Sequence, residues 1–127
     1  MASVTVNLDQ SAVVTFNAQG AGTAQLGPLN QREAWAPAVA SVKTTQAPAQ
    51  IVNEAQCKIF CGPDTSDTNY VDGTLSGSTG DSTSNIAGNA VNCGEYVFAV
   101  WSGGDAGAQG RLRVTGTKQL AGARRRP

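Results

Sequence analysis

The 127-residue sequence contains no histidine, and aromatic residues make up only 6% of it. Histidine is the usual general acid or base near neutral pH, because its pKa lies in that range. Its absence excludes hydrolytic triads of the Ser-His type. It also leaves three cysteines as candidate zinc ligands, whereas a structural zinc site needs four Cys or His side chains. We therefore expect a protein that is not an enzyme, binds no metal and carries no cofactor.

The sequence also lacks long hydrophobic runs. No segment approaches the roughly 18 apolar residues of a membrane span, and the first residues, MASVTVNLDQ, have neither the basic start nor the apolar run of a signal peptide. We expect a protein that is made in a cytoplasm and does not enter a membrane. The length suits one domain with a single core, and 15 glycines favour strands joined by tight turns.

Net charge is absent as well, but the charges are unevenly distributed along the chain. Residues 62–105 contain only acidic charges, and residues 106–127 contain only basic charges. The acidic residues are Asp64, Asp67, Asp72, Asp81, Glu95 and Asp105, and the basic residues are Arg111, Arg113, Lys118, Arg124, Arg125 and Arg126. This asymmetry fits either a solvated surface with a disordered tail or charges that guide association with a copy or a partner.

The basic end, AGARRRP, allows three interpretations. These are a solvated terminus, a segment that docks on an acidic protein surface, and a segment that contacts the phosphates of nucleic acid. No aromatic residues interleave with the arginines, which argues against nucleic acid. We divide the chain into a domain of residues 1–117 and a flexible basic tail of residues 118–127. The candidate partner contacts are Lys118, Arg124, Arg125 and Arg126 in the tail, with Asp64, Asp67 and Asp105 in acidic loops.

Other polar motifs do not match a ligand site. Asp64, Asp67 and Asp72 lack the D-x-D-x-D-G spacing of a calcium loop, so we interpret them as solvated acids. The glycine-rich WSGGDAGAQG has no Gly-Lys-Ser/Thr and opens no helix. We interpret it as a hairpin loop and not as a phosphate cradle.

The three cysteines allow two interpretations. On a strand, Cys57 and Cys61 share one face with Ile59, because side chains alternate. They are then buried or half-buried thiols that act as small hydrophobic residues. Alternatively, Cys57 or Cys61 forms a disulfide with Cys93, and Cys61 with Cys93 is the candidate pair. Such a bond would have to form after release from a reducing cytoplasm.

Alternating apolar and polar residues recur along the chain, and no window shows a convincing helical period. Val4, Val6 and Leu8 indicate a first strand. The runs 11–16 and 22–26 flank NAQGA and predict a hairpin. Pro37 lies within the run 33–42 and predicts an edge strand or a bulge.

Further strands follow in the second half. A run at 55–61 ends at the turn signal GPD, and NYVDGTL and SNIAGN predict two short edge strands. The stretch 95–114 predicts a hairpin. Its first strand is apolar on both faces and should be central and covered on each side. Its second strand should point Leu112 and Val114 inward and Arg111 and Arg113 outward.

The patterns together predict an all-β protein. We expect about eight short antiparallel strands in a two-sheet sandwich, jelly-roll-like or related, followed by the flexible basic tail.

Several of these motifs, in this order, resemble a known group of proteins. They are VTFNAQGAGTAQLGP, Trp35 with VASVKTT, AQCKIFCG, DGTLSGS, and GEYVFAVWSGGDAGAQGRLRVTGT. Over roughly residues 11–117 the chain resembles small accessory structural proteins of tailed bacteriophages, particularly phages of actinobacteria.

The resemblance implies a compact β-sandwich on the virion surface. It implies a capsid decoration protein that binds the major capsid protein. The alternative is a minor tail protein, which would contact tail proteins or recognise host glycans. Glycan binding would use an exposed Trp35 or Trp101, although a tryptophan in this pattern is more often a core residue. We expect a homo-oligomer. The quasi-threefold positions of a capsid lattice suggest a trimer. We also expect the first strand and residues 118–127 to make contacts between subunits or with the capsid.

Overall fold

The structure is a computed structural model, and it describes residues 4–29, 31–45, 51–76 and 80–120. This part of the chain is nearly all β, as the alternating patterns predicted. Its strands are β1 (Val4–Thr15), β2 (Gly22–Leu26), β3 (Glu33–Thr45), β4 (Gln56–Gly62), β5 (Tyr70–Ser76), β6 (Asp81–Thr83), β7 (Tyr96–Ser102) and β8 (Gln109–Leu120), and a single 3₁₀ turn spans Asp67–Asn69. Among these residues no helix is long and apolar enough to cross a membrane.

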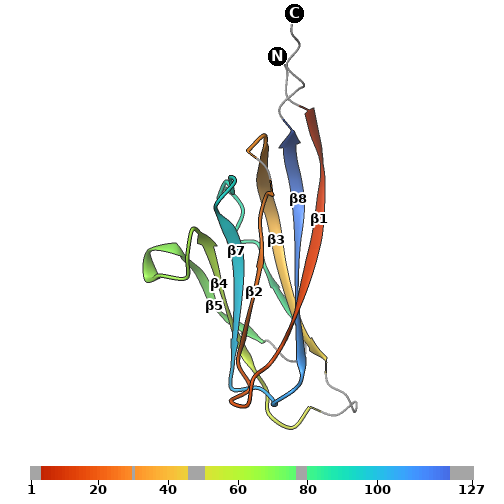
Figure 1. The fold of residues 1–127 in the computed structure, drawn as a ribbon, viewed down its shortest axis with the longest axis vertical. Coiled ribbons are helices and arrows are strands. Elements are labelled where there is room, and N and C mark those ends of the chain that lie inside the picture. The colour runs from red at the N-terminus through yellow and green to blue at the C-terminus, as the bar shows by residue number, and fades with distance from the viewer. Residues whose placement is uncertain (1–3, 30, 46–50, 77–79, 121–127) are drawn as a thin grey trace, which may run out of the picture.

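The strands form two antiparallel sheets that pack face to face (Figure 1). One sheet has the order β1-β8-β3-β6 and is here called the long sheet. The other has the order β2-β7-β4-β5 and is called the short sheet. The first strand pairs with the last, the second with the second to last, and the same rule continues to the middle of the chain. The resulting ladders are β1/β8, β2/β7, β3/β6 and β4/β5. Eight strands that pair in this way and fold into two sheets form a jelly roll.

This topology makes two predicted hairpins wrong. The strands on either side of NAQGA lie in different sheets, and so do β7 and β8, which come from the stretch 95–114. Among the named strands, only β4 and β5 are consecutive in sequence and paired. The physical reason is that β7 and β8 each have an apolar face. In separate sheets the two faces cover each other across the core, which side-by-side pairing would not achieve.

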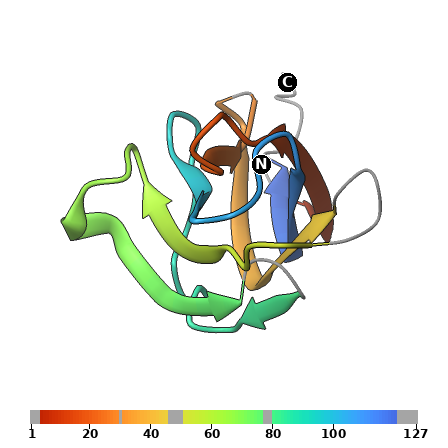
Figure 2. The ribbon, with the colours of Figure 1, turned by 90° about the horizontal axis from the view of Figure 1, so that it is seen from below.

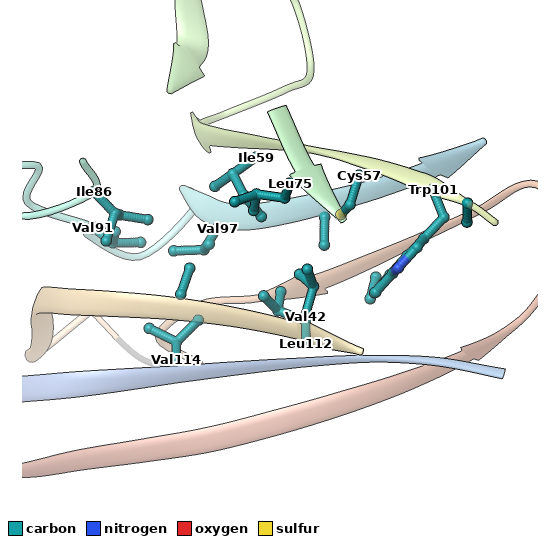
Figure 3. Packing of buried hydrophobic residues seen from close by; sticks show 14 of the residues in the cluster. Val42, Cys57, Ile59, Leu75, Ile86, Val91, Val97, Trp101, Leu112 and Val114 are labelled. Carbon is teal, nitrogen blue, oxygen red and sulfur yellow. The ribbon is translucent and has the colours of Figure 1, made fainter. Parts of the chain in front are cut away.

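The core lies between the sheets, and side chains of both sheets meet there (Figure 3). Leu112 and Val114 point inward from β8 as predicted, and Trp101 is fully buried. The Trp101 ring lies 5.7 Å from the ring of Phe16, measured between centroids. The fully buried side chains are Trp101, Leu8, Ile59, Ile86, Leu112, Val42, Val91, Val97, Val114 and Cys57.

The strand β7 is central in the short sheet, as predicted, but its outer face is not covered by another layer. The register places Phe98 beside Phe60 on that face. Tyr70 packs edge-on against Phe60 at 5.8 Å, and Tyr96 packs edge-on against Phe98 at 5.7 Å, again between centroids. A row of four aromatic side chains therefore takes the place of the covering layer and leaves both phenylalanines buried.

Two predictions about individual strands, the one at Pro37 and the one at SNIAGN, have different outcomes. The ladder between β3 and β8 shifts register between Pro37 and Val39, which confirms a bulge at this proline. The predicted strand SNIAGN is wrong. The short strand β6 ends at Thr83, and a turn follows in which the Ala87 N–H donates to Ser84 and Ile86 fills the core.

The C-terminal boundary also differs from the expectation. Residues 118–120 complete β8 and pair with β1 and β3, so they belong to the sandwich and not to a tail. The rest of the predicted tail, including Arg124, Arg125 and Arg126, lies outside the described residues.

Candidate functional site

The two ends of the sandwich differ. At one end the long sheet projects beyond the short sheet, and β1 begins and β8 ends there (Figure 1). We call this the open end. At the opposite end, the turn 16–21, residues 51–55 and the loop 103–108 meet. We call this the closed end, and Figure 2 shows it from below.

A groove runs around the tip of β2 at the open end. Its volume is about 410 Å³. The lining residues are Gln10, Gln25, Leu26, Gly27, Leu29, Glu33, Trp35, Tyr96 and Lys118. The floor therefore comes from β1, β3 and β8 of the long sheet, and the wall comes from β2, the residues that follow it, and Tyr96 of β7. The groove combines aromatic side chains, two amides and one pair of opposite charges.

The charge pair joins Lys118 and Glu33. The Lys118 Nζ lies 3.3 Å from the Glu33 Oε2, and their side chains are only 21% and 12% exposed. The β3/β8 ladder causes this contact, because it places Glu33 opposite Leu120 and Trp35 opposite Lys118. Lys118 was predicted to be a partner contact. The structure places it in the groove, where its charge is paired with that of Glu33.

Trp35 also belongs to the groove, but it is only 4% exposed. Its backbone exchanges two hydrogen bonds with Val91, at 2.8 and 3.0 Å. The indole Nε1 is buried and has no acceptor among the described residues. Since Trp101 is fully buried too, neither tryptophan is the exposed platform that glycan binding through tryptophan requires. That part of the alternative prediction is wrong, because both indoles are used in the core.

Asp64 and Asp67 remain exposed, as expected of solvated loop acids. The Asp64 Oδ1 accepts a hydrogen bond from the Ser66 N–H at 3.1 Å and another from the Asn69 side chain at 2.7 Å. Hydrogen bonding from Ser66, supported by Asn69, lowers the pKa of Asp64. The loop between β4 and β5 thus carries two exposed carboxylates, and that of Asp64 is held in a hydrogen-bonded turn.

Asp105 does not join them. It is only 7% exposed and lies at the closed end, so it is not available as a partner contact. Its carboxylate accepts hydrogen bonds from the Val52 N–H at 2.8 Å, the Asn53 N–H at 2.9 Å and the Asn53 side chain at 2.8 Å. These bonds, that from Val52 first, lower the pKa of Asp105. The residue ties the loop 103–108 to the segment that leads into β4.

All three cysteines are free thiols, so the candidate disulfide between Cys61 and Cys93 is not formed. The register places Cys61 opposite Val97, while Cys93 lies upstream in an exposed turn. Cys57 is buried and Cys61 half-buried on the inner side of β4, which supports the other interpretation. Burial raises the pKa of Cys57 to about 12 and that of Cys61 to about 11, so both are protonated at neutral pH.

Among the described residues, the charges of the acidic and basic blocks of the sequence do not form separate blocks in space. Arg111, Arg113 and Lys43 gather on the outer face of the long sheet, around a shallow hollow of about 340 Å³ that Asp81 also lines. Arg113 makes a bidentate contact with Asp9, at 2.9 and 2.8 Å. Because strands from distant parts of the sequence alternate in each sheet, the charges intermix. Over the described ranges, no cluster of three or more metal-ligating side chains occurs.

Comparison of the chain with protein-family models, with curated proteins and with solved structures found no match. The described residues define an architectural class, an eight-stranded jelly roll with one closed end and one open, grooved end.

Most of the groove could not be predicted from the sequence. Glu33, Gln10 and Gln25 were not candidates, because nothing local marks them. Glu33 and Lys118 are far apart in sequence, and only the long-sheet register brings them together. A weak signal was present, since both charged residues lie at otherwise inward-facing positions of their strands.

Proposed function

We propose that this protein is a non-enzymatic structural component of a bacteriophage virion, and that it decorates the capsid by binding the major capsid protein. Its sequence motifs, which resemble those of accessory virion proteins, indicate the kind of assembly. The observation that supports attachment is the asymmetry of the two ends. The open end carries the start of β1, the end of β8, a groove and exposed apolar side chains, whereas the loops of the closed end are linked to one another by hydrogen bonds.

The apolar side chains of the open end suit a protein partner. Leu29 is 92% exposed beside the groove, and Val4 is 53% exposed. Val4 pairs directly with Leu120, which is also exposed, at the end of the β1/β8 ladder. An apolar centre with paired charges nearby is the composition of a typical protein–protein contact. In this arrangement the jelly roll would stand on the capsid by its open end, with the closed end facing outward.

The first experiment is a count of copies per purified virion, by quantitative mass spectrometry against the major capsid protein. Hundreds of copies support decoration of the capsid lattice. A handful would move the protein to the tail, and none would reject the virion proposal.

A binding assay with capsids that lack the protein tests the open end directly. Leu29→Ser should weaken saturable binding to such capsids. Val52→Ser is the matched control, because Val52 is a similarly exposed apolar residue at the closed end. Equal binding by both variants and the wild type would contradict attachment through the open end.

The groove favours one alternative, a minor tail protein that recognises a host glycan. Gln10 and Gln25 offer amide groups, and Tyr96 offers part of an aromatic ring, which is a common set for sugar hydroxyls and C–H faces. This alternative predicts few copies per virion and binding to a glycan array that Gln25→Ala abolishes.

A further inference from the structure

The four edges of the two sheets are protected to different degrees. The edge strand β6 spans only Asp81–Thr83, and β2 spans only Gly22–Leu26. The edge strand β5 is irregular, since its ladder with β4 shifts register twice. Short strands and bulges are devices that keep a sheet edge from pairing with another chain. The fourth edge, β1, is twelve residues long and pairs with β8 without a register shift.

The sequence of β1, VTVNLDQSAVVT, contains no lysine, arginine or proline that would protect its edge. Its single charge, Asp9, is held by the bidentate contact with Arg113 of the neighbouring strand β8. No other described strand pairs with β1 on its free side. The β1 edge is therefore long, regular and without a free charge.

The alternation of the backbone identifies the groups at this edge. The Phe16 N–H donates to the Ala108 carbonyl at 2.8 Å, on the β8 side. Because successive residues point their N–H and C=O groups to opposite sides, even-numbered residues of β1 face β8. Thr5, Asn7, Asp9 and Ser11 consequently direct their backbone groups away from the sheet. These residues offer donors and acceptors for one more antiparallel strand.

We propose that this strand is β1 of a second copy, so that two long sheets join into one continuous sheet across a two-fold axis. Gly22 of β2 lies against the Val14 side chain on the inner face of β1. We assign the pairing to residues 4–12, which lie beyond this contact. Antiparallel pairing of this part with itself centres on Leu8. With a two-fold axis at Leu8, the same residues of both copies meet, so the contact is self-complementary, as in other isologous dimers.

The side chains agree with this register. On the outer face, Asn7 would lie opposite Asp9 of the second copy, and Thr5 would lie opposite Ser11. Polar groups thus meet polar groups, and the two Asp9 carboxylates do not face each other. On the inner face, Leu8 would lie opposite Leu8 of the second copy, and Val4 opposite Ala12. Val6 would lie opposite Gln10 in the same register. The chain's zero net charge adds no repulsion between copies.

This pairing goes beyond the proposed function, because it concerns two copies of the chain and holds whether or not a capsid is the partner. The contact involves one strand from each copy and lies at the small end of specific interfaces. Sedimentation equilibrium of the purified protein should therefore show a concentration-dependent exchange between monomer and dimer. A strict monomer at high concentration, or a trimer, would overturn the proposal.

Ser11→Pro tests the edge itself. The change removes a free-edge N–H and places the ring there, and it leaves the β8 side of the ladder intact. We expect a monomer with an unchanged circular dichroism spectrum. Ser11→Ala is the matched control, because it keeps the N–H and should keep the dimer. A folded Ser11→Pro variant that still dimerises would overturn the proposal.

Hydrogen exchange supplies a second readout that does not depend on a variant. When concentration is raised into the dimer range, the amides of Thr5, Asn7, Asp9 and Ser11 should become slower to exchange. The amides of Val6, Leu8 and Gln10 should be slow at both concentrations, since they face β8. Equal slowing of both sets, or of neither, would overturn the β1 pairing.

Discussion

The closed end and the open end belong to the same two sheets, but they differ in how their loops and side chains are bonded. At the closed end, the Gly104 N–H donates to Gly20 at 3.0 Å and the Gly107 N–H donates to Phe16 at 3.2 Å. These bonds join the loop 103–108 to the turn 16–21, and Asp105 adds the segment before β4. At the open end the two sheets separate around a groove, and apolar side chains remain exposed. Within one fold, the ends therefore differ in hydrogen bonding between loops and in the presence of a groove, although each end also exposes an apolar side chain, Val52 at the closed end and Leu29 at the open end.

Glycine explains how closely the closed end is packed. Gly20 has φ of +72°, and a Cβ at this position would overlap the Gly104 carbonyl. A Cβ on Gly110 would lie 2.8 Å from the Trp101 ring. Both positions need glycine, the first for its backbone and for close approach, and the second for space.

The largest expected effect comes from Trp101, whose ring fills the core near the closed end. Trp101→Ala should lower the free energy of unfolding by about 3–5 kcal/mol, because it leaves a large cavity. Denaturant unfolding measures this. Trp35→Phe, at the open end, is the control and should cost less than about 1.5 kcal/mol, since it removes an N–H that lacks an acceptor among the described residues. Similar losses in both variants would show that the Trp101 ring is not tightly packed in the core.

The next effect depends on pH and concerns Asp105. Its pKa lies below the ordinary value of 3.8 in the folded protein. The ionised form therefore stabilises the fold above that value, and this stability is lost as the pH falls through the lower, folded-state pKa. Thermal unfolding between pH 5 and pH 2 should show a falling midpoint. Asp105→Asn should start lower and fall less, and an equal decline in both proteins would contradict the role of this carboxylate.

A smaller effect is expected from the charge pair in the groove. Glu33→Gln or Lys118→Met should each cost about 1–2 kcal/mol, because each leaves a half-buried charge without its partner. The double variant should cost less than the sum of the two. A double-mutant cycle in urea measures the coupling, and strict additivity would show that the two side chains do not interact.

The smallest expected effect on stability concerns the thiols, which differ in their exposure to solvent. Cys93 is exposed, so Cys93→Ser should change the free energy of unfolding by less than about 0.5 kcal/mol. A thiol reagent at pH 8 should label Cys93 quickly in the wild type, Cys61 slowly and Cys57 only after unfolding. Rapid labelling of Cys57 in the native protein would show that the core at β4 opens readily.

Local patterns predicted the strands far better than their partners. The alternation around Leu112 and Val114 identified the inward face of β8, and Pro37 marked a bulge. The pairing of β7 with β8 was wrong because a short glycine-rich loop is compatible with a hairpin and with a crossing between sheets. The choice depends on which apolar faces cover each other, and that is a property of the whole core.

The candidate site was predicted less well, for a related reason. Asp64 and Asp67 kept their exposed loop position because a polar turn determines it locally. Asp105 also lies in a glycine-rich loop, yet backbone N–H groups from a distant segment surround it. Nothing in the residues near Asp105 distinguishes these two outcomes.

The sequence by itself determined the all-β class, most strand positions and the inward faces, because side-chain alternation and turn residues act over a few positions. Only the tertiary structure decided the jelly-roll order, the groove with its Glu33–Lys118 pair and the free edge of β1. These features depend on register between strands that are far apart in the chain. Burial of both apolar faces in one core sets that register, and no local segment contains the information.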